Sequence, residues 1–313
     1  MDARTIGLIG GILLLLGAAE AVVRILKNHQ DSGVDPAILA TFHLRVRAWW
    51  SLFAVLAAAF FLGKTATVVL FGLIAFWALR EFITLTPTRP GDHHALFWVF
   101  FVFTPLQFFL VGLGQYQYYS VVIPICGLLF IPWRIAMAGD RKRFLERMAK
   151  IQAGLLICVY CLSYAPALMT LELPGESAGR NVNLLLFFVL IVQLSDALQY
   201  VWAQIPSRHV IVPTISPNRT WEGLIGGSAS VTLIGIALYW ATPFPFYFAG
   251  LVSLAVSLLG FAGGLTMSAI KRDRGVKDYG TLVEGHHGVL DRIDSLCFAA
   301  PVFFHFTLWF FPT

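Results

Sequence analysis

The sequence has few charged residues for its length. Of its 313 residues, 12% are charged and 58% are hydrophobic, and the formal net charge is +5. Soluble domains carry about a quarter charged residues, so this composition excludes an ordinary soluble domain. The positive charge gathers in loops on one side of the apolar segments, which is typical of membrane topology rather than of a nucleic-acid surface. Nucleic acid is therefore not expected as a partner.

Cysteine is scarce as well. The four cysteines, Cys126, Cys158, Cys161 and Cys297, all lie in apolar segments. Cys158 and Cys161 form a C-x-x-C pair, but they lack the nearby second pair or histidine that a zinc site needs. All four are interpreted as packing residues.

Long apolar runs dominate what is present. A membrane-spanning helix needs about 20 mostly apolar residues, and the sequence predicts an all-α, polytopic integral membrane protein with about ten transmembrane helices. The predicted spans are 5–26, 47–63, 66–86, 96–114, 119–136, 152–171, 181–203, 223–242, 247–270 and 295–311. The first run is too long for the apolar region of a cleaved signal peptide, so it is interpreted as the first span.

Lysine and arginine determine the predicted orientation. If the loop after the ninth span is cytosolic, all but Arg4, Lys64 and Arg180 of the 22 Lys and Arg residues lie on the cytosolic side. Because cytosolic loops carry an excess of these residues, both termini are predicted outside. We expect the lipid bilayer of a bacterial inner (plasma) membrane, with the polar loops and the active site on the cytosolic side.

The densest polar segment, 268–294, lies between the last two predicted spans. It contains four cations, three carboxylates and a Gly-His-His-Gly turn: Lys271, Arg272, Arg274, Lys277, Asp278, Asp291, Asp294 and 285–288. Carboxylates bind hard divalent metals, cations bind phosphates, and glycines let the backbone approach an anion. The pattern indicates chemistry on a phosphate that a lipid carries.

A second polar segment, 214–227, lies on the same predicted side. Ser216 and Pro217 predict a turn or helix start. Arg219 adds positive charge, and Glu222 is a candidate metal ligand. Three glycines that permit close helix approach follow: Gly223, Gly226 and Gly227.

Asp196 is a carboxylate inside a predicted span. It lies about eight residues from the cytosolic end, or roughly 12 Å deep. Intramembrane carboxylates are costly and usually functional, so Asp196 is a candidate site residue.

Together these segments resemble the signature of the phosphatidate cytidylyltransferase (CDP-diacylglycerol synthase) family. The main element matches at Ser268, Lys271, Arg272, Lys277, Asp278, Gly280, His286, Gly288, Asp291, Arg292 and Asp294. Upstream elements match at Ser216, Pro217, Thr220, Glu222, Gly223, Asp196 and Tyr200. The chain departs from the family at His287, where the family has Gly, and at Arg219, where it has Lys. Leu198 and Gln199 replace small residues.

The resemblance implies transfer of the cytidylyl group of CTP to phosphatidate, which gives CDP-diacylglycerol and pyrophosphate. The catalytic residues would be Lys271, Arg272, Lys277, Asp278, Asp291 and Arg292. Substrate contacts would come from Ser216, Arg219, Asp196, His286, His287 and Gly288. One or two Mg²⁺ ions would be held by Asp278, Asp291, Asp294 and Glu222. A monovalent cation and a homodimer are further expectations.

Three alternatives are also compatible with the sequence. The acceptor could be another lipid, such as a polyprenol-type alcohol that takes phosphate from CTP, with His286 or His287 as the base. Asp196 would also suit a transporter, although the polar residues gather on one face rather than along a pore. His287 would suit an inactive, lipid-binding relative of the enzyme.

The spans and loops predict one membrane domain, 1–313, with generic helices over 1–171. A catalytic part over 181–311 would carry the cytosolic loops 204–222 and 271–294. Arg80 and Glu81 are interpreted as side chains that reach the interface, and the basic loop 141–150 as a topology determinant that contacts headgroups. Asp92-His93-His94 is interpreted as a loop rather than a metal site.

Overall fold

The protein is almost entirely helical. The structure is a computed structural model that describes residues 3–28, 46, 50, 53–54, 57–85, 88–173, 180–205, 209–276, 278–279 and 288–311. Its α-helices are α1 Ala3–Asn28, α3 Lys64–Thr84, α4 His93–Trp98, α5 Thr104–Gly112, α6 Tyr116–Val121, α7 Leu128–Ala136, α8 Phe144–Gly154, α9 Leu162–Ala167, α10 Arg180–Trp202, α11 Trp221–Ala237, α12 Phe246–Asp273 and α13 Leu290–Phe310.

Three pairs of these helices are continuous through a wider, π-helical turn. Val99–Phe103 joins α4 to α5, Val122–Gly127 joins α6 to α7, and Leu155–Cys161 joins α8 to α9. Short 3₁₀ turns at Pro90–Asp92, Leu168–Thr170 and Tyr239–Ala241 complete the helical part.

Within the described residues, seven helices are long and apolar enough to cross a membrane. They are Lys64–Thr84, Pro90–Gly112, Tyr116–Ala136, Phe144–Thr170, Asn181–Trp202, Phe246–Asp273 and Leu290–Phe310. The predicted class, an all-α polytopic membrane protein, is confirmed. The predicted span 223–242 corresponds to α11, a shorter apolar helix of 17 residues. Of the predicted span 47–63, the structure describes only residues 50, 53–54 and 57–63.

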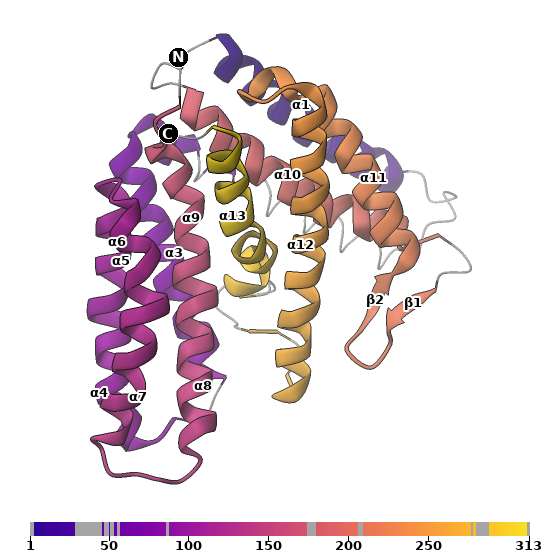
Figure 1. The fold of residues 1–313 in the computed structure, drawn as a ribbon. Helices are drawn as coiled ribbons and strands as arrows, with labels where there is room; N and C mark the ends of the chain where they lie inside the picture. The colour runs from indigo at the N-terminus through magenta and orange to yellow at the C-terminus, as the bar shows by residue number, and fades with distance from the viewer. Residues whose placement is uncertain are drawn as a thin grey trace.

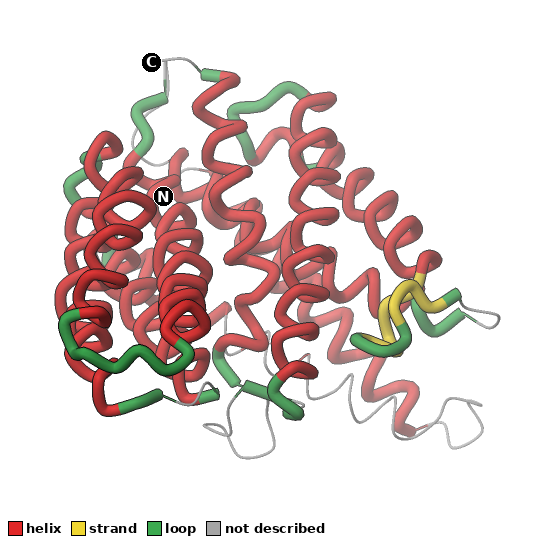
Figure 2. The backbone as a smooth tube through the Cα atoms, turned by 60° about the horizontal axis from the view of Figure 1, so that its bottom comes forward, coloured by secondary structure: helices red, strands yellow, loops and turns green. Residues whose placement is uncertain are grey.

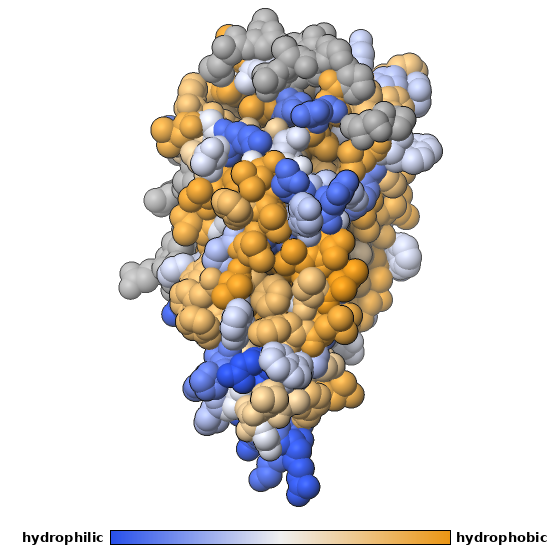
Figure 3. Space-filling view, turned by 60° about the vertical axis from the view of Figure 1, so that its left-hand side comes forward, coloured by the Kyte–Doolittle hydropathy of each residue, from blue (hydrophilic) through white to orange (hydrophobic). Residues whose placement is uncertain are grey.

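The helices form two groups with α13 between them (Figure 1). Helices α3 to α9 run side by side in one group, and α10, α11 and α12 form the other, while α13 packs against both α9 and α12. One apolar core is shared by the two groups and includes Phe82, Cys158, Phe188, Cys297 and Phe303. The first group is covered by a broad apolar band with hydrophilic residues above and below it (Figure 3).

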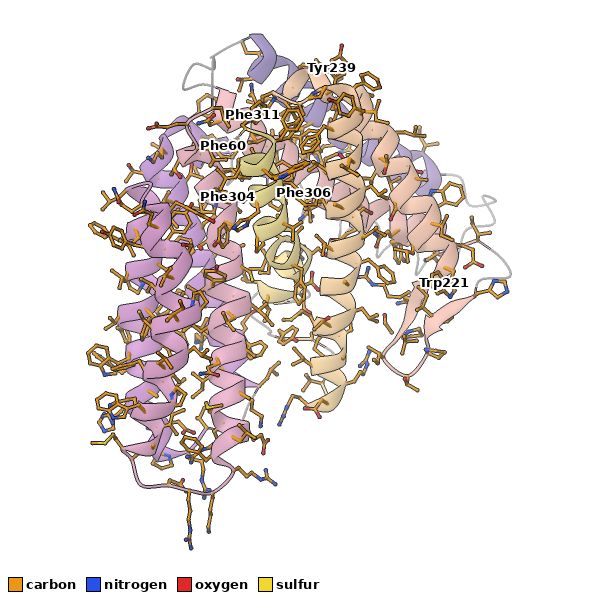
Figure 4. All side chains as sticks on the ribbon, viewed as in Figure 1. Phe60, Trp221, Tyr239, Phe304, Phe306 and Phe311 are labelled. Carbon is orange, nitrogen blue, oxygen red and sulfur yellow. The ribbon has the colours of Figure 1, made fainter. Side chains whose placement is uncertain are left out.

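Aromatic side chains gather at the end of the molecule where both termini lie. Phe60, Tyr239, Phe304, Phe306 and Phe311 all lie in that half of the molecule (Figure 4). Trp221 lies apart from them, beside the strands. Aromatic residues are typical of the boundary between lipid and water.

A small antiparallel hairpin connects α10 to α11 (Figure 2). Strand β1, Val210–Val212, pairs with β2, Ser216–Thr220. Of the turn or helix start predicted at Ser216, the helix start is wrong, because Ser216 follows the turn 213–215 and begins β2, and the helix cap is Thr220. The Thr220 side chain accepts a hydrogen bond from the Gly223 amide at 3.0 Å, which satisfies one of the unpaired donors at the start of α11.

The interpretation of the basic loop 141–150 as a segment that contacts headgroups is wrong for Arg147. Arg147 is only 4% exposed and pairs with Asp140 (Nη1–Oδ2, 2.7 Å) and with Asp92 (Nε–Oδ1, 3.4 Å). The amide of Lys142, followed by Arg147 and Arg89, lowers the pKa of the Asp140 carboxyl. Arg147 therefore ties α8 to the segment before α4 instead of contacting headgroups, because a buried cation needs a paired carboxylate.

Candidate active site

The signature residues meet where α12 ends and α13 begins. Lys271 Nζ contacts Asp291 Oδ1 at 2.6 Å, and the two side chains are 15% and 7% exposed. The other carboxylate oxygen of Asp291 accepts the amide of Tyr279 at 2.9 Å and that of Gly288 at 3.2 Å. Asp291 thus holds together the end of α12, the segment after it and the first turn of α13.

The local sequence ends α12 at this point. Gly275 adopts a left-handed conformation with φ of 68°, and its amide bonds the carbonyl of Arg272 at 3.0 Å. A glycine suits this conformation because it has no Cβ to strain the backbone. Lys271 and Arg272 consequently lie in the last turn of α12, where the helix dipole favours cations.

Arg219 reaches the same region from β2. Its Nη1 donates to Gln199 Oε1 at 3.0 Å, and its guanidinium carbon lies 5.0 Å from the centroid of the Phe261 ring. A Cβ added to Gly264 would lie 2.0 Å from Arg219 Nη2 and 3.7 Å from Asp294 Oδ2. The guanidinium therefore packs directly on the α12 backbone, close to the Asp294 carboxylate.

Asp196 and Asp294 share one hydroxyl group. Ser295 Oγ lies 3.0 Å from Asp196 Oδ1 and 3.5 Å from Asp294 Oδ1. The carbonyl of Gly260, 3.2 Å from the same oxygen, is another acceptor for its single proton. Two neighbouring carboxylates repel each other when both are charged, and a cation between them relieves that repulsion. This oxygen-rich pair fits the chemistry of Mg²⁺, which prefers carboxylate ligands.

Other predicted residues lie elsewhere or have local partners. Glu222 contacts the ring of His209 (Oε1–Nδ1, 2.6 Å) and also accepts the His209 amide. Arg272 Nε donates to the carbonyl of Ile215 in the hairpin at 3.2 Å. Ser216 pairs with Val212 in the strand register.

The remaining predicted residues are only partly described. Asp278 is partly exposed, and Arg292 is partly exposed in the first turn of α13. Lys277, His286 and His287 lie outside the described residues. Among the described residues, no group of three or more His, Cys, Asp or Glu side chains forms a metal site, so the four-residue metal set stays a prediction.

Gln199 is a site residue that the sequence reasoning missed. Its amide nitrogen bonds Ser195 Oγ at 2.9 Å and Ser257 Oγ at 3.1 Å, and its oxygen accepts Arg219. It therefore links a buried serine cluster to the cation at the site. The departure from small residues was the available signal, because a buried amide needs polar partners.

The glycines of α11 explain how Gln199 fits at this crossing. A Cβ at Gly227 would lie 2.7 Å from the Gln199 backbone nitrogen, and one at Gly223 would lie 2.7 Å from its carbonyl oxygen. At Gly226, it would lie 2.4 Å from the Trp202 ring. The predicted close helix approach at these three glycines is confirmed.

Glu81 was missed as well, and its interpretation as an interfacial side chain is wrong. The residue is 3% exposed and accepts the amides of Val289 at 3.0 Å and Leu290 at 2.8 Å. No local pattern in the sequence links α3 to α13. The only signal was an acidic residue at the end of an apolar span.

Residues 43–310 match the cytidylyltransferase family. The chain is 36% identical over 264 residues to the uncharacterized protein YnbB of Escherichia coli (strain K12). This match covers 84% of this chain and 86% of that protein. It is 37% identical over 129 residues to the phosphatidate cytidylyltransferase of Staphylococcus aureus (strain COL). That match covers 41% of this chain and 50% of the relative. The protein is an integral membrane protein, and it belongs to the cytidylyltransferase family.

Gly264→Ala tests the placement of Arg219. The new methyl group would displace the flexible guanidinium rather than the helix, and alanine favours a helix interior over glycine by about 1 kcal/mol. We expect the turnover number for cytidylyl transfer to fall ~10-fold or more, while the melting temperature stays near that of the wild type. Both are measured on purified protein.

A double-mutant cycle provides the control for this substitution. If Gly264→Ala acts through Arg219, adding it to Arg219→Ala causes little further loss, because the two changes remove one interaction. Additive losses in turnover would contradict the assignment.

Proposed function

We propose that the protein transfers the cytidylyl group of CTP to phosphatidate and so forms CDP-diacylglycerol and pyrophosphate. One observation carries the proposal: in a member of the cytidylyltransferase family, the Lys271–Asp291 pair joins the ends of α12 and α13. Arg219 and Asp294 meet beside Gly264 of α12. Such a cluster suits two polyanionic reactants, since cations neutralise phosphates and carboxylates bind the accompanying metal.

The reaction forms one phosphorus–oxygen bond and breaks another. An oxygen of the phosphatidate phosphate attacks the α-phosphorus of CTP, and the bond from that phosphorus to the bridging oxygen of the β-phosphate breaks. Pyrophosphate leaves with that oxygen. A phosphate monoester is already ionised at neutral pH, so no general base is required.

The residues of this chain contribute charge and position. Lys271, Arg272 and Arg219 would neutralise the phosphates and the developing charge on pyrophosphate. Lys271 and Arg272 lie in the last turn of α12, and Arg219 lies in β2, so regular secondary structure positions all three before the substrates bind. Of the predicted metal ligands, Asp278, Asp291 and Asp294 would hold Mg²⁺, with Asp196 in place of Glu222, whose carboxylate contacts His209. When it is bound, Mg²⁺ supplies Lewis-acid stabilisation of the phosphoryl oxygens.

Thiol labelling tests the proposed cytosolic side. In a Cys126→Ser background, which removes an exposed cysteine, we expect Thr214→Cys to be shielded from an impermeant reagent in intact cells. Glu172→Cys, on the other predicted side, should react. Both positions are exposed, and the positive residues near the hairpin favour a cytosolic location. Labelling of Thr214→Cys with protection of Glu172→Cys would invert the orientation.

A direct assay tests the reaction. Purified protein in detergent is incubated with Mg²⁺, phosphatidate and CTP labelled in the α-phosphate. The label should enter the lipid, and the unlabelled pyrophosphate that is released is measured separately. Equal amounts of the two products are expected. A polyprenol-type alcohol replaces phosphatidate in a parallel sample that contains CTP labelled in the γ-phosphate. Transfer of the γ-label to the alcohol, without labelled lipid from phosphatidate, would instead make the protein a lipid kinase.

A further inference from the structure

We propose that Glu81 of α3 is a positioning residue for the reacting end of α13. Its two carboxylate oxygens accept one amide each, from Val289 at 3.0 Å and from Leu290 at 2.8 Å. The side chain is 3% exposed, so water does not compete for these bonds. The proposal rests on the proposed function, since it concerns the residues that would act on CTP.

The chemistry of a helix start explains the choice of residue. The first amides of a helix have no partner within it, and they carry the positive end of the helix dipole. A carboxylate satisfies two such donors and balances their partial charge. A glutamine of the same size offers one acceptor oxygen, and its NH₂ group would face the second amide.

The capped amides adjoin the reacting residues directly. Leu290 precedes Asp291 in the chain, and Gly288, which precedes Val289, donates its amide to Asp291. A shift at the start of α13 would therefore change the distance from Asp291 to Lys271, which is now 2.6 Å. The cap also occupies two donors of the α13 terminus, so those amides do not bind substrate phosphates.

A second contact from α3 supports the same role. Phe82, the next residue, stacks on the Tyr279 ring with centroids 6.4 Å apart and planes 16° apart. The amide of Tyr279 is another donor to Asp291. Neighbouring residues of α3 thus contact two of the segments that hold Asp291, and the first helix group takes part in the geometry of the site.

Three variants test the proposal on the full-length protein. Glu81→Gln removes the charge and one acceptor, while Glu81→Asp keeps the carboxylate on a shorter side chain. Gln152→Ala is the matched control, because it breaks a hydrogen bond to the Leu128 carbonyl within the first helix group rather than one to α13. The readouts are kcat, the KM for CTP, the melting temperature, and hydrogen exchange of the Val289 and Leu290 amides.

We expect Glu81→Gln to lower kcat ~10-fold or more with a smaller change in KM, because the lost alignment matters most in the transition state. The two amides should exchange faster than in the wild type. Glu81→Asp should recover part of both effects. Gln152→Ala should leave kcat and the exchange of these amides unchanged, even if its melting temperature falls as far as that of Glu81→Gln.

The opposite results would overturn the proposal. Wild-type kcat in Glu81→Gln would do so, as would a loss of kcat with no change in amide exchange. If the wild type transfers no cytidylyl group to any acceptor, the proposed function fails. The exchange rates, which need no activity, then decide separately whether Glu81 holds the start of α13, and unchanged rates in Glu81→Gln would reject it.

Discussion

Asp291→Asn is expected to reduce cytidylyl transfer at least ~100-fold, the size of effect seen when one preorganised charged group is lost from an active site. Asp291 accepts Lys271 on one oxygen and the amides of Tyr279 and Gly288 on the other. Asparagine keeps the shape but loses the charge, and its NH₂ group would oppose a donor on one side. The measurement is kcat at saturating CTP, phosphatidate and Mg²⁺.

Asp273→Asn is the matched control for this substitution. Asp273 lies in the last turn of the same helix as Lys271, and its side chain is 67% exposed in a pair with Arg274. An exposed pair contributes little to stability, so turnover should stay near that of the wild type. If Asp291→Asn retained as much activity as Asp273→Asn, Asp291 would have no part in the reaction.

Lys271→Met is expected to have the second large effect. The substitution keeps the length of the side chain but removes the cation that contacts Asp291 and lies 5.4 Å from the centroid of the Tyr279 ring. It also leaves Asp291 without its charged partner. Because the cation would stabilise the pyrophosphate leaving group, we expect kcat/KM for CTP to fall ~100-fold or more.

Lys150→Met serves as the comparison. Lys150 is also largely buried, with 17% exposure, and forms an ion pair with Glu146. It lies in α8, and its loss should reduce stability at most. Equal losses of kcat/KM in the two variants would mean that general destabilisation, rather than a missing charge at the site, explains the effect of Lys271→Met.

Local patterns in the sequence singled out residues that the structure brings together where these residues lie on adjoining elements. Lys271 and Asp291 are separated by 20 residues, and both belong to one signature, so their pairing follows from a short connection between two spans. Arg219 was also identified from a family element, but its hydrogen bond to Gln199 was not predicted. A helix start was one of the two readings of Ser216, which suits a cap, but strand pairing places Ser216 in β2 and the cap at Thr220.

Long-range contacts could not be predicted in this way. The partners of Glu81 lie 208 and 209 residues away, and the pairing of Arg147 with Asp92 depends on how two helices pack. Hydrophobic periodicity shows that a residue lies in a span but gives no information about its partner. Acidic residues in apolar spans are therefore a useful signal of an unseen partner rather than of exposure.

The cap from Glu81 also has a consequence for biogenesis. Helix α3 enters the bilayer long before α13, the last helix described, has been synthesised. Until α13 arrives, the Glu81 carboxylate lacks the two amides that bind it in the folded protein, and an unpaired charge in an apolar interior is costly. The contacts that position the site therefore also favour the complete chain over one that ends before α13.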